Sequence, residues 1–263
     1  MVSRAGGSAA PSGLEDPIDA LAAQQAELID LVAERDEPAL SQPSRCGGWS
    51  AADVLLHLAQ TNEMAVASVQ GRLPEYVASV TDLVPAAGDI DEWAGALVDA
   101  ERSTAVAARD RYVASAAEQE AAFRAAAPDT RVQWVAGEMA ARTLATTRLT
   151  ETWIHTVDAA TAFGIDPAPT DRLWHVARLV WRTVPYALSR GGAQATVDVA
   201  FELTAPSGDT WTFGDPATAG TVVRGEAVEL CTVAGQRADA ASTGLVATGP
   251  DAEPVLRLMR TFA

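Results

Sequence analysis

The residues of this chain best suited to chemistry are a glutamate and a histidine on one predicted helix, in the segment Glu151-Thr-Trp-Ile-His155. Residues four apart on a helix project from the same face, so the Glu151 carboxylate and the His155 imidazole can bind one divalent metal ion. His57, on an earlier predicted helix, could supply a third ligand. Three protein ligands leave coordination positions open, which favours a catalytic metal over a structural one. The alternative is a polar pair within one helix, because this spacing also occurs by chance.

The composition excludes several other kinds of site. All 19 residues in the Lys+Arg total are arginine, and without lysine the chain cannot form a Schiff base or supply a phosphate-loop lysine. The formal net charge of −16 argues against binding to a nucleic-acid backbone. The sequence contains no Gly-x-Ser-x-Gly, Gly-x-Gly-x-x-Gly or Cys-x-x-Cys motif. We therefore expect a small-molecule substrate as the partner, and no nucleic acid.

Length and hydropathy bound the organisation. The 263 residues, 48% of them hydrophobic, can fill one large domain or two ordinary ones. No apolar run approaches about 18 residues without a charge, so no membrane span is expected. Residues 1–14 lack the apolar core of a signal peptide and are predicted to be a disordered tail. Cys46 and Cys231 do not make a disulfide framework, which favours the cytoplasm.

Periodic apolar residues predict a helical domain over residues 15–168. Its helices are expected over 17–34, from 50 onward, over 90–127 with breaks, and over 137–163. Ser50 and Asp53 form a capping-box pattern at the start of the second helix. His57 shares a stripe with apolar neighbours there, so it is expected to face the interior, either as a ligand or as a core histidine bonded to a carbonyl.

The last of these helices carries four ionisable residues on one stripe: Arg148, Glu151, His155 and Asp158. Apolar residues flank this stripe, which favours a buried polar seam over a solvated face. Asp158 lies three residues after His155 and could orient its ring by accepting a hydrogen bond. The alternative for Asp158 is an ordinary surface charge.

The pattern after residue 168 predicts a small α+β domain over residues 169–263. The expected elements are a helix over 171–188, a hairpin of strands over 195–203 and 210–213, a strand near 221, a helix over 227–237, and a closing helix or strand over 255–262.

These segments resemble the DinB-like metalloenzymes of the mycothiol-dependent maleylpyruvate isomerase family. That family carries a Gly-Trp-Ser/Thr-x-x-Asp/His-x-x-x-His-Leu segment, matched here from Gly48 to Leu58, and a later Glu-x-x-x-His-x-x-Asp segment, matched from Glu151 to Asp158. The second half is similar to the C-terminal domain of one subgroup, up to Arg237. The resemblance covers nearly all of the chain after residue 15. It implies a fold of class α plus α+β, with a DinB-like four-helix bundle followed by a small sterol-carrier-like domain.

The resemblance also implies a zinc or similar divalent ion held by His57, Glu151 and His155. Two nitrogen ligands with one carboxylate suit Zn²⁺ or Ni²⁺ better than Mg²⁺ or Ca²⁺. In thiol-transfer members of the family the metal binds the sulfur of a low-molecular-weight thiol, which is mycothiol in actinobacteria. Arg237 matches an arginine near the cleft, where it would hold a substrate carboxylate or a developing enolate. Its alternative is an arginine at a helix end, interacting with the helix dipole.

Two aromatic positions are further candidates for substrate binding. Trp211, together with Phe213, could bury an apolar part of the substrate. Trp49 is expected either to pack under the metal-binding helices or to form a platform for a ligand.

Three more residues have weaker signals. Cys46 precedes the second helix, where the helix dipole would favour a thiolate, or it is simply a small residue tolerated there. His175 is expected to be structural, with the carboxylate of Asp171 as its partner. Cys231 is expected to be buried in its helix.

Three functions therefore stay open. The first is a metal-dependent isomerase or S-transferase in which mycothiol adds to, isomerises or displaces a group on a small electrophile. The second uses the same metal as a Lewis acid without a thiol, in natural-product cyclisation or hydrolysis. The third is a non-catalytic, metal-containing module that binds a hydrophobic metabolite. The arginine- and alanine-rich composition suits an actinobacterial genome, and a monomer or homodimer is expected.

Overall fold

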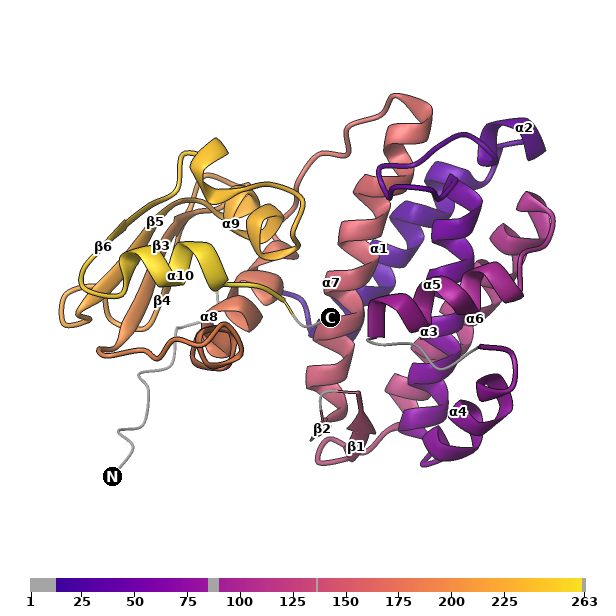
Figure 1. The fold of residues 1–263 in the computed structure, drawn as a ribbon, viewed down its shortest axis with the longest axis horizontal. Helices are drawn as coiled ribbons and strands as arrows, with labels where there is room; N and C mark the ends of the chain where they lie inside the picture. The colour runs from indigo at the N-terminus through magenta and orange to yellow at the C-terminus, as the bar shows by residue number, and fades with distance from the viewer. Residues whose placement is uncertain (1–12, 85–89, 136, 262–263) are drawn as a thin grey trace. The chain divides into compact units, whose positions relative to one another are not determined.

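The structure is a computed structural model that describes residues 13–84, 90–135 and 137–261 (Figure 1). The chain divides into two compact units, one formed by Pro17–Pro167 and the other by the remaining described residues. The first is mainly helical and the second contains a small sheet. The tail predicted over residues 1–14 lies, apart from its last two residues, outside the described ranges.

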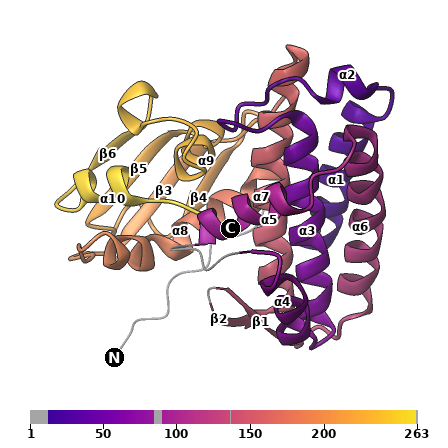
Figure 2. The ribbon, with the colours of Figure 1, turned by 45° about the vertical axis from the view of Figure 1, so that its right-hand side comes forward.

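The unit Pro17–Pro167, called the helical unit below, is built around long helices that lie side by side (Figures 1 and 2). Helix α3 (Ala51–Val69) packs against α6 (Ala105–Ala125) and α7 (Ala141–Ala160), and α1 (Pro17–Val32) packs against the same two helices. The elements of this unit are α1 (Pro17–Val32), α2 (Glu37–Leu40), α3 (Ala51–Val69), α4 (Leu73–Thr81), α5 (Ile90–Ala100), α6 (Ala105–Ala125), β1 (Arg131–Trp134), β2 (Gly137–Ala140), α7 (Ala141–Ala160) and the short 3-10 helix η1 (Thr161–Phe163).

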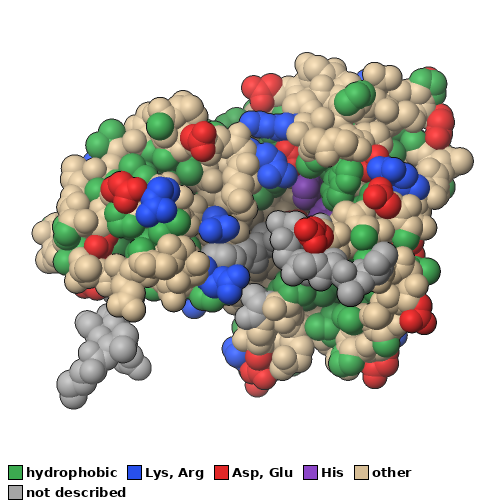
Figure 3. Space-filling view, viewed as in Figure 1, with side chains coloured by type: hydrophobic (Ala, Val, Ile, Leu, Met, Phe, Trp, Pro, Cys, Tyr) green, Lys and Arg blue, Asp and Glu red, His purple; other side chains and the backbone are tan. Residues whose placement is uncertain are grey.

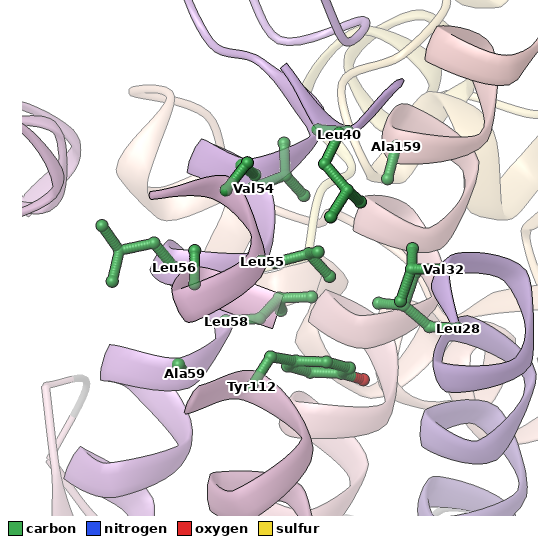
Figure 4. Packing of buried hydrophobic residues seen from close by; sticks show 14 of the residues in the cluster. Leu28, Val32, Leu40, Val54, Leu55, Leu56, Leu58, Ala59, Tyr112 and Ala159 are labelled. Carbon is green, nitrogen blue, oxygen red and sulfur yellow. The ribbon is translucent and has the colours of Figure 1, made fainter. Parts of the chain in front are cut away.

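Leucines from three helices fill the centre of the helical unit (Figure 4). Leu28 from α1 meets Leu55 and Leu58 from α3, and all three are fully buried. The ring of Tyr112 from α6 closes the same cluster. Each buried leucine contributes about 1.5–3 kcal/mol to folding, so this cluster holds α3 firmly between its neighbours.

The predicted capping box at the start of α3 is confirmed. The hydroxyl of Ser50 accepts a hydrogen bond from the backbone N–H of Asp53 at 3.1 Å, and the Asp53 carboxylate accepts one from the Ser50 N–H at 2.8 Å. Both bonds satisfy N–H groups that the helix itself leaves unpaired. The start of α3 is thereby fixed two turns before His57.

The helix predicted over 137–163 begins later than expected. Gly137–Ala140 form β2, which pairs antiparallel with β1, and α7 starts only at Ala141. The strand pairing prevails because Val132 and Trp134 alternate with exposed residues and bury their side chains, while Gly137 takes a φ of +106° that favours glycine. The irregular stretch predicted over 90–127 is confirmed as two helices, α5 and α6, with Thr104 capping the second. The short helices α2 and α4 were not predicted.

The second unit consists of a four-stranded sheet with helices, in the strand order β4-β3-β5-β6. The predicted hairpin is confirmed, since β3 and β4 pair antiparallel with Leu203 opposite Trp211. Strands β3 and β5 are parallel, and β6 was not predicted. The elements are α8 (Leu173–Arg190), β3 (Val199–Thr204), β4 (Thr210–Phe213), β5 (Thr221–Glu226), α9 (Ala227–Ala234), η2 (Ala240–Ser242), β6 (Val246–Thr248) and α10 (Ala252–Leu258).

The helix α8 packs on this sheet through aromatic side chains. The rings of Trp174 and Trp181 lie 5.6 and 6.3 Å from the ring of Phe213, measured between centroids. The Trp181 indole N–H also donates to the carbonyl of Val199 at 2.8 Å.

Among the helices formed by the described residues, none combines the length and the apolar character that a membrane span requires.

A buried carboxylate anchors the segment that leads into β3. The Asp251 carboxylate accepts hydrogen bonds from the N–H of Thr196 at 2.8 Å, the N–H of Val197 at 3.1 Å and the hydroxyl of Thr196 at 2.7 Å. Asp251 is only 3% exposed. The hydrogen bonds from Thr196 outweigh burial and lower the pKa of Asp251.

We predict that Asp251→Asn lowers the free energy of unfolding by about 1–3 kcal/mol at pH 7, because two backbone N–H groups lose a charged acceptor. The folded-state pKa of Asp251 lies below that of the unfolded chain, so its contribution is complete above the unfolded pKa of about 3.9. That contribution is lost as the pH falls through the folded pKa. Urea unfolding should show that the difference in free energy of unfolding between wild type and variant is smaller at pH 3 than at pH 7. The exposed Asp209→Asn is the control, and an equal gap at both pH values would contradict the assignment.

Candidate metal centre

Helices α3 and α7 bring the three predicted ligands together in the helical unit. Nε2 of His57, on α3, lies 3.6 Å from Oε2 of Glu151, on α7. Nε2 of His155 lies 3.6 Å from the same oxygen. All three side chains are largely buried, and Figure 3 shows a small purple area of histidine on the surface of the helical unit. The side chains of the three residues are only 9–14% exposed, so the centre is largely shielded from solvent.

The donor atoms of His57, Glu151 and His155 all lie within 4.8 Å of one another. In a tetrahedral zinc site with bonds of about 2.0–2.1 Å, neighbouring ligand atoms are about 3.3 Å apart. The two distances of 3.6 Å therefore need only small adjustments to surround an ion. In chemistry and in spacing, this donor set fits a divalent metal.

Asp158 lies directly behind His155. Its Oδ2 is 3.0 Å from Nδ1 of His155, and the residue is fully buried at 0% exposure. The alternative of a surface charge is therefore wrong. A carboxylate that binds one ring nitrogen fixes the ring and directs the other nitrogen, here toward Glu151.

Cys46 also belongs to this site, which the sequence left undecided. Its thiol donates to Oδ2 of Asp158 at 3.2 Å, and its sulfur lies 3.8 Å from Nδ1 of His155. The neighbouring Arg45 N–H donates to the carbonyl of Asp158 at 3.1 Å, so the loop before α3 is tied to the end of α7. Cys46, His155 and Asp158 form a second group of possible metal donors. That group would use the same Nδ1 that Asp158 already binds, so the first set is the better site.

The charges of the three ligands follow from their neighbours. Burial opposes ionisation of Glu151, but hydrogen bonds from His155 and His57 outweigh it and hold the pKa of Glu151 well below its usual value. Burial lowers the pKa of His57. For His155 burial acts in the same direction, yet hydrogen bonds to Asp158 and Cys46 raise its pKa well above the ordinary value. A metal ion would therefore find an anionic carboxylate and a neutral His57, and would displace a proton from His155.

Trp49 flanks the centre. Its ring lies 5.3 Å from the ring of His57, and its partly buried side chain packs against the hydrophobic core of the helical unit. This position agrees with the expected packing role under the metal-binding helices. The platform role requires ligand contact and stays a prediction.

Arg237 belongs to the second unit, where it follows α9. The helix ends in a hydrogen-bonded turn in which the Arg237 N–H donates to the carbonyl of Thr232 at 2.9 Å. Gln236 takes the left-handed conformation, with φ of +58°, that glycine usually supplies there. The guanidinium is half-buried and donates to the carbonyl of Gly235 at 3.0 Å. Arg237 thus makes a contact at the end of a helix, as expected from the alternative to a substrate-binding role.

Arg237 also lines an open hollow of about 1160 Å³ in the second unit. Two further arginines, Arg257 and Arg260, line the same hollow. The Arg257 guanidinium pairs with Glu253 at 2.7 Å. Arginine is thus available in this hollow for an acidic ligand, alongside apolar surface from Leu245 and Met259.

The expectation that Trp211 contacts substrate needs correction. Trp211 is 2% exposed and Phe213 is fully buried, so both side chains belong to the core between the sheet and α8. Strand alternation determined this outcome, because both residues fall on the covered face of β4. Neither offers surface to a ligand in this structure.

The remaining two predictions concern residues of the second unit. His175 is buried, and its Nε2 lies 3.0 Å from the carbonyl of Glu15, which agrees with a structural role. The carboxylate of Asp171 accepts a hydrogen bond from the Ser207 N–H at 3.1 Å. Cys231 is fully buried as predicted, and burial raises the pKa of its thiol.

Comparison with known proteins gives consistent matches. The model of the mycothiol maleylpyruvate isomerase N-terminal domain matches residues 21–160. Two uncharacterised proteins, from two strains of Mycobacterium tuberculosis, are each 32% identical over 245 residues, which is 92% of this chain and 93% of each relative. Crystal structures of the mycothiol-dependent maleylpyruvate isomerase and of its histidine-to-alanine variant match with TM-scores of 0.58 and 0.57. Each is 18% identical and covers 90% of this chain and 94% of the other, so this likeness concerns the fold.

Proposed function

This chain belongs to the mycothiol-dependent maleylpyruvate isomerase family, and on that premise we propose that it is a metal-dependent enzyme that uses mycothiol as a cosubstrate. The thiol would add to a small electrophilic substrate, and isomerisation or thiol transfer would follow. The observation that carries the proposal is the convergence of His57, Glu151 and His155, with 3.6 Å between the carboxylate oxygen and each imidazole nitrogen.

The ion would be held by His57, Glu151 and His155, and Zn²⁺ or Ni²⁺ suits two imidazoles and one carboxylate best. When bound, such an ion supplies Lewis acidity and lowers the pKa of a thiol that binds it. Asp158 lies 3.0 Å from Nδ1 of His155, and by fixing this ring it would leave Nε2 available as the metal ligand. Three protein ligands leave room for a thiol or a substrate oxygen.

Arg237 would orient the substrate. A guanidinium is permanently charged and binds a carboxylate through two parallel hydrogen bonds. The chain has a formal net charge of −16, so a local cluster of arginines would be needed to attract an anionic substrate. The hollow lined by Arg237, Arg257 and Arg260 supports this role.

We predict that the purified protein contains one divalent ion per chain and that His155→Ala removes most of it, because one of three ligands is lost. His175→Ala should keep the wild-type metal content, since His175 lies in the other unit against the Glu15 carbonyl. Elemental analysis of proteins purified without a metal-affinity tag measures both. Equal metal content in wild type and His155→Ala would eliminate the proposed centre.

Thiol use has its own test. We expect reduced mycothiol, and not its disulfide, to produce a sulfur-to-metal charge-transfer absorption when it is added to Co²⁺-substituted protein. Turnover of maleylpyruvate, or of whichever electrophile is accepted, should stop when mycothiol is left out. Full turnover without any thiol would replace this proposal by Lewis-acid catalysis, and metal without any turnover or thiol binding would favour the ligand-binding module.

We predict that Arg237→Ala lowers kcat/KM by about 10²-fold or more, as expected for a lost charge-assisted contact of roughly 3 kcal/mol. Metal content should not change, because Arg237 belongs to the second unit. Arg257→Ala, in the same hollow but exposed and paired with Glu253, is the matched control and should lose less. Normal turnover by Arg237→Ala would confine the chemistry to the helical unit.

A further inference from the structure

A buried arginine lies next to the proposed metal centre without being one of its ligands. Arg148, on α7, is only 2% exposed. One nitrogen of its guanidinium donates to the hydroxyl of Thr61, on α3, at 2.8 Å. Its Nε is also buried, and it finds no acceptor among the described residues. A guanidinium is charged in proteins, so a cation lies inside the helical unit here with one N–H that has no acceptor among the described residues.

The position of this arginine follows from helix geometry. Arg148 precedes Glu151 by three residues, so the two lie on the same face of α7, about 4.5 Å apart along its axis. Thr61 follows His57 by one turn on α3. The contact between Arg148 and Thr61 therefore lies one helical turn from the contact between Glu151 and His57, between the same two helices. The guanidinium is fixed one turn away from the ligands.

Packing alone does not require a cation here. A buried charge with an unfilled donor is costly, and replacing such a residue by an apolar one of similar size is often neutral or stabilising. The charge lies close to the ligands, because Arg148 is three residues from Glu151 on α7 and its partner Thr61 is four residues from His57 on α3.

The carboxylates around the centre give this cation its importance. Glu151 and Asp158 together would cancel the charge of a divalent ion, and both lie in the buried seam. Arg148 adds one positive charge to these groups. With a divalent ion bound, the site would therefore carry a net positive charge. In a poorly solvated interior such a charge acts strongly on whatever binds next to it.

We propose that Arg148 is a positioning residue whose fixed positive charge makes the open positions of the metal centre prefer anions, such as a thiolate or a carboxylate, over neutral ligands. The inference rests on the proposed metal site but on neither thiol nor substrate. The Arg148 charge that attracts anions also repels the metal cation. Removing this charge should therefore not weaken metal binding.

The test uses Co²⁺-substituted full-length protein and azide as an anionic probe, with binding followed by the visible absorption of the cobalt. We expect Arg148→Met to raise the dissociation constant for azide about tenfold, as one charge near the centre predicts. Its affinity for Co²⁺, measured by competition with a chelator, should be equal to or higher than that of wild type. Arg142→Met removes the same charge from an exposed position on α7 and is the matched control, with unchanged azide binding.

Either of two results for Arg148→Met would overturn the inference. Wild-type azide affinity in Arg148→Met would show that the charge does not act on the centre, and a parallel loss of cobalt and azide would show a merely structural role. If Arg148→Met does not fold, Thr61→Val keeps the charge but removes its hydrogen-bond acceptor, and it should weaken azide binding by part of the same factor. Unchanged azide binding there would also overturn the inference. Failure of wild type to bind cobalt would reject the metal centre itself.

Discussion

Polar side chains buried between α3 and α7 must find partners within the helical unit, and this requirement governs how the two helices meet. His57 contacts Glu151 at 3.6 Å, and one turn away Thr61 accepts a hydrogen bond from Arg148 at 2.8 Å. From the first contact to the second, the residue numbers rise along α3, from 57 to 61, and fall along α7, from 151 to 148. The two helices are therefore antiparallel where these residues meet. A shift by one residue would break both contacts and leave charged groups unpaired in the interior, which is far more costly than a small loss of apolar contact.

The apolar core makes that register possible. Leu55 and Leu58 lie in the apolar cluster with residues of α1 and α6 and anchor α3 against these helices. The capping box at Ser50 then sets where α3 begins, and the loop through Cys46 binds the far end of α7 at Asp158. Both contacts support the ligands from the end of the seam where α3 begins and α7 ends, which is the kind of support that a metal site with few protein ligands needs.

Much of this could be predicted from the sequence because it depends on local spacing. The Glu151–His155 pair, the Ser50 cap and the β3–β4 hairpin all follow from residues close together in the chain. Cys46 and Arg148 could not be assigned in the same way, because their neighbours Asp158 and Thr61 are 112 and 87 residues away. The late start of α7 was missed for a related reason. Glu138, Met139 and Ala140 are good helix formers, and the pairing with β1 overrides this local preference.

The absence of lysine bears on how such a seam can work. A lysine buried as deeply as Arg148 would tend to give up its proton, because burial disfavours the charged form of an amine. The guanidinium resists this, and burial lowers its pKa from a value so high that the charge is kept. Arginine is therefore the side chain that can carry a lasting positive charge one turn from Glu151. The two carboxylates and the Arg148 cation then set the charge that a bound ion would meet, while the two imidazoles would supply neutral donor atoms.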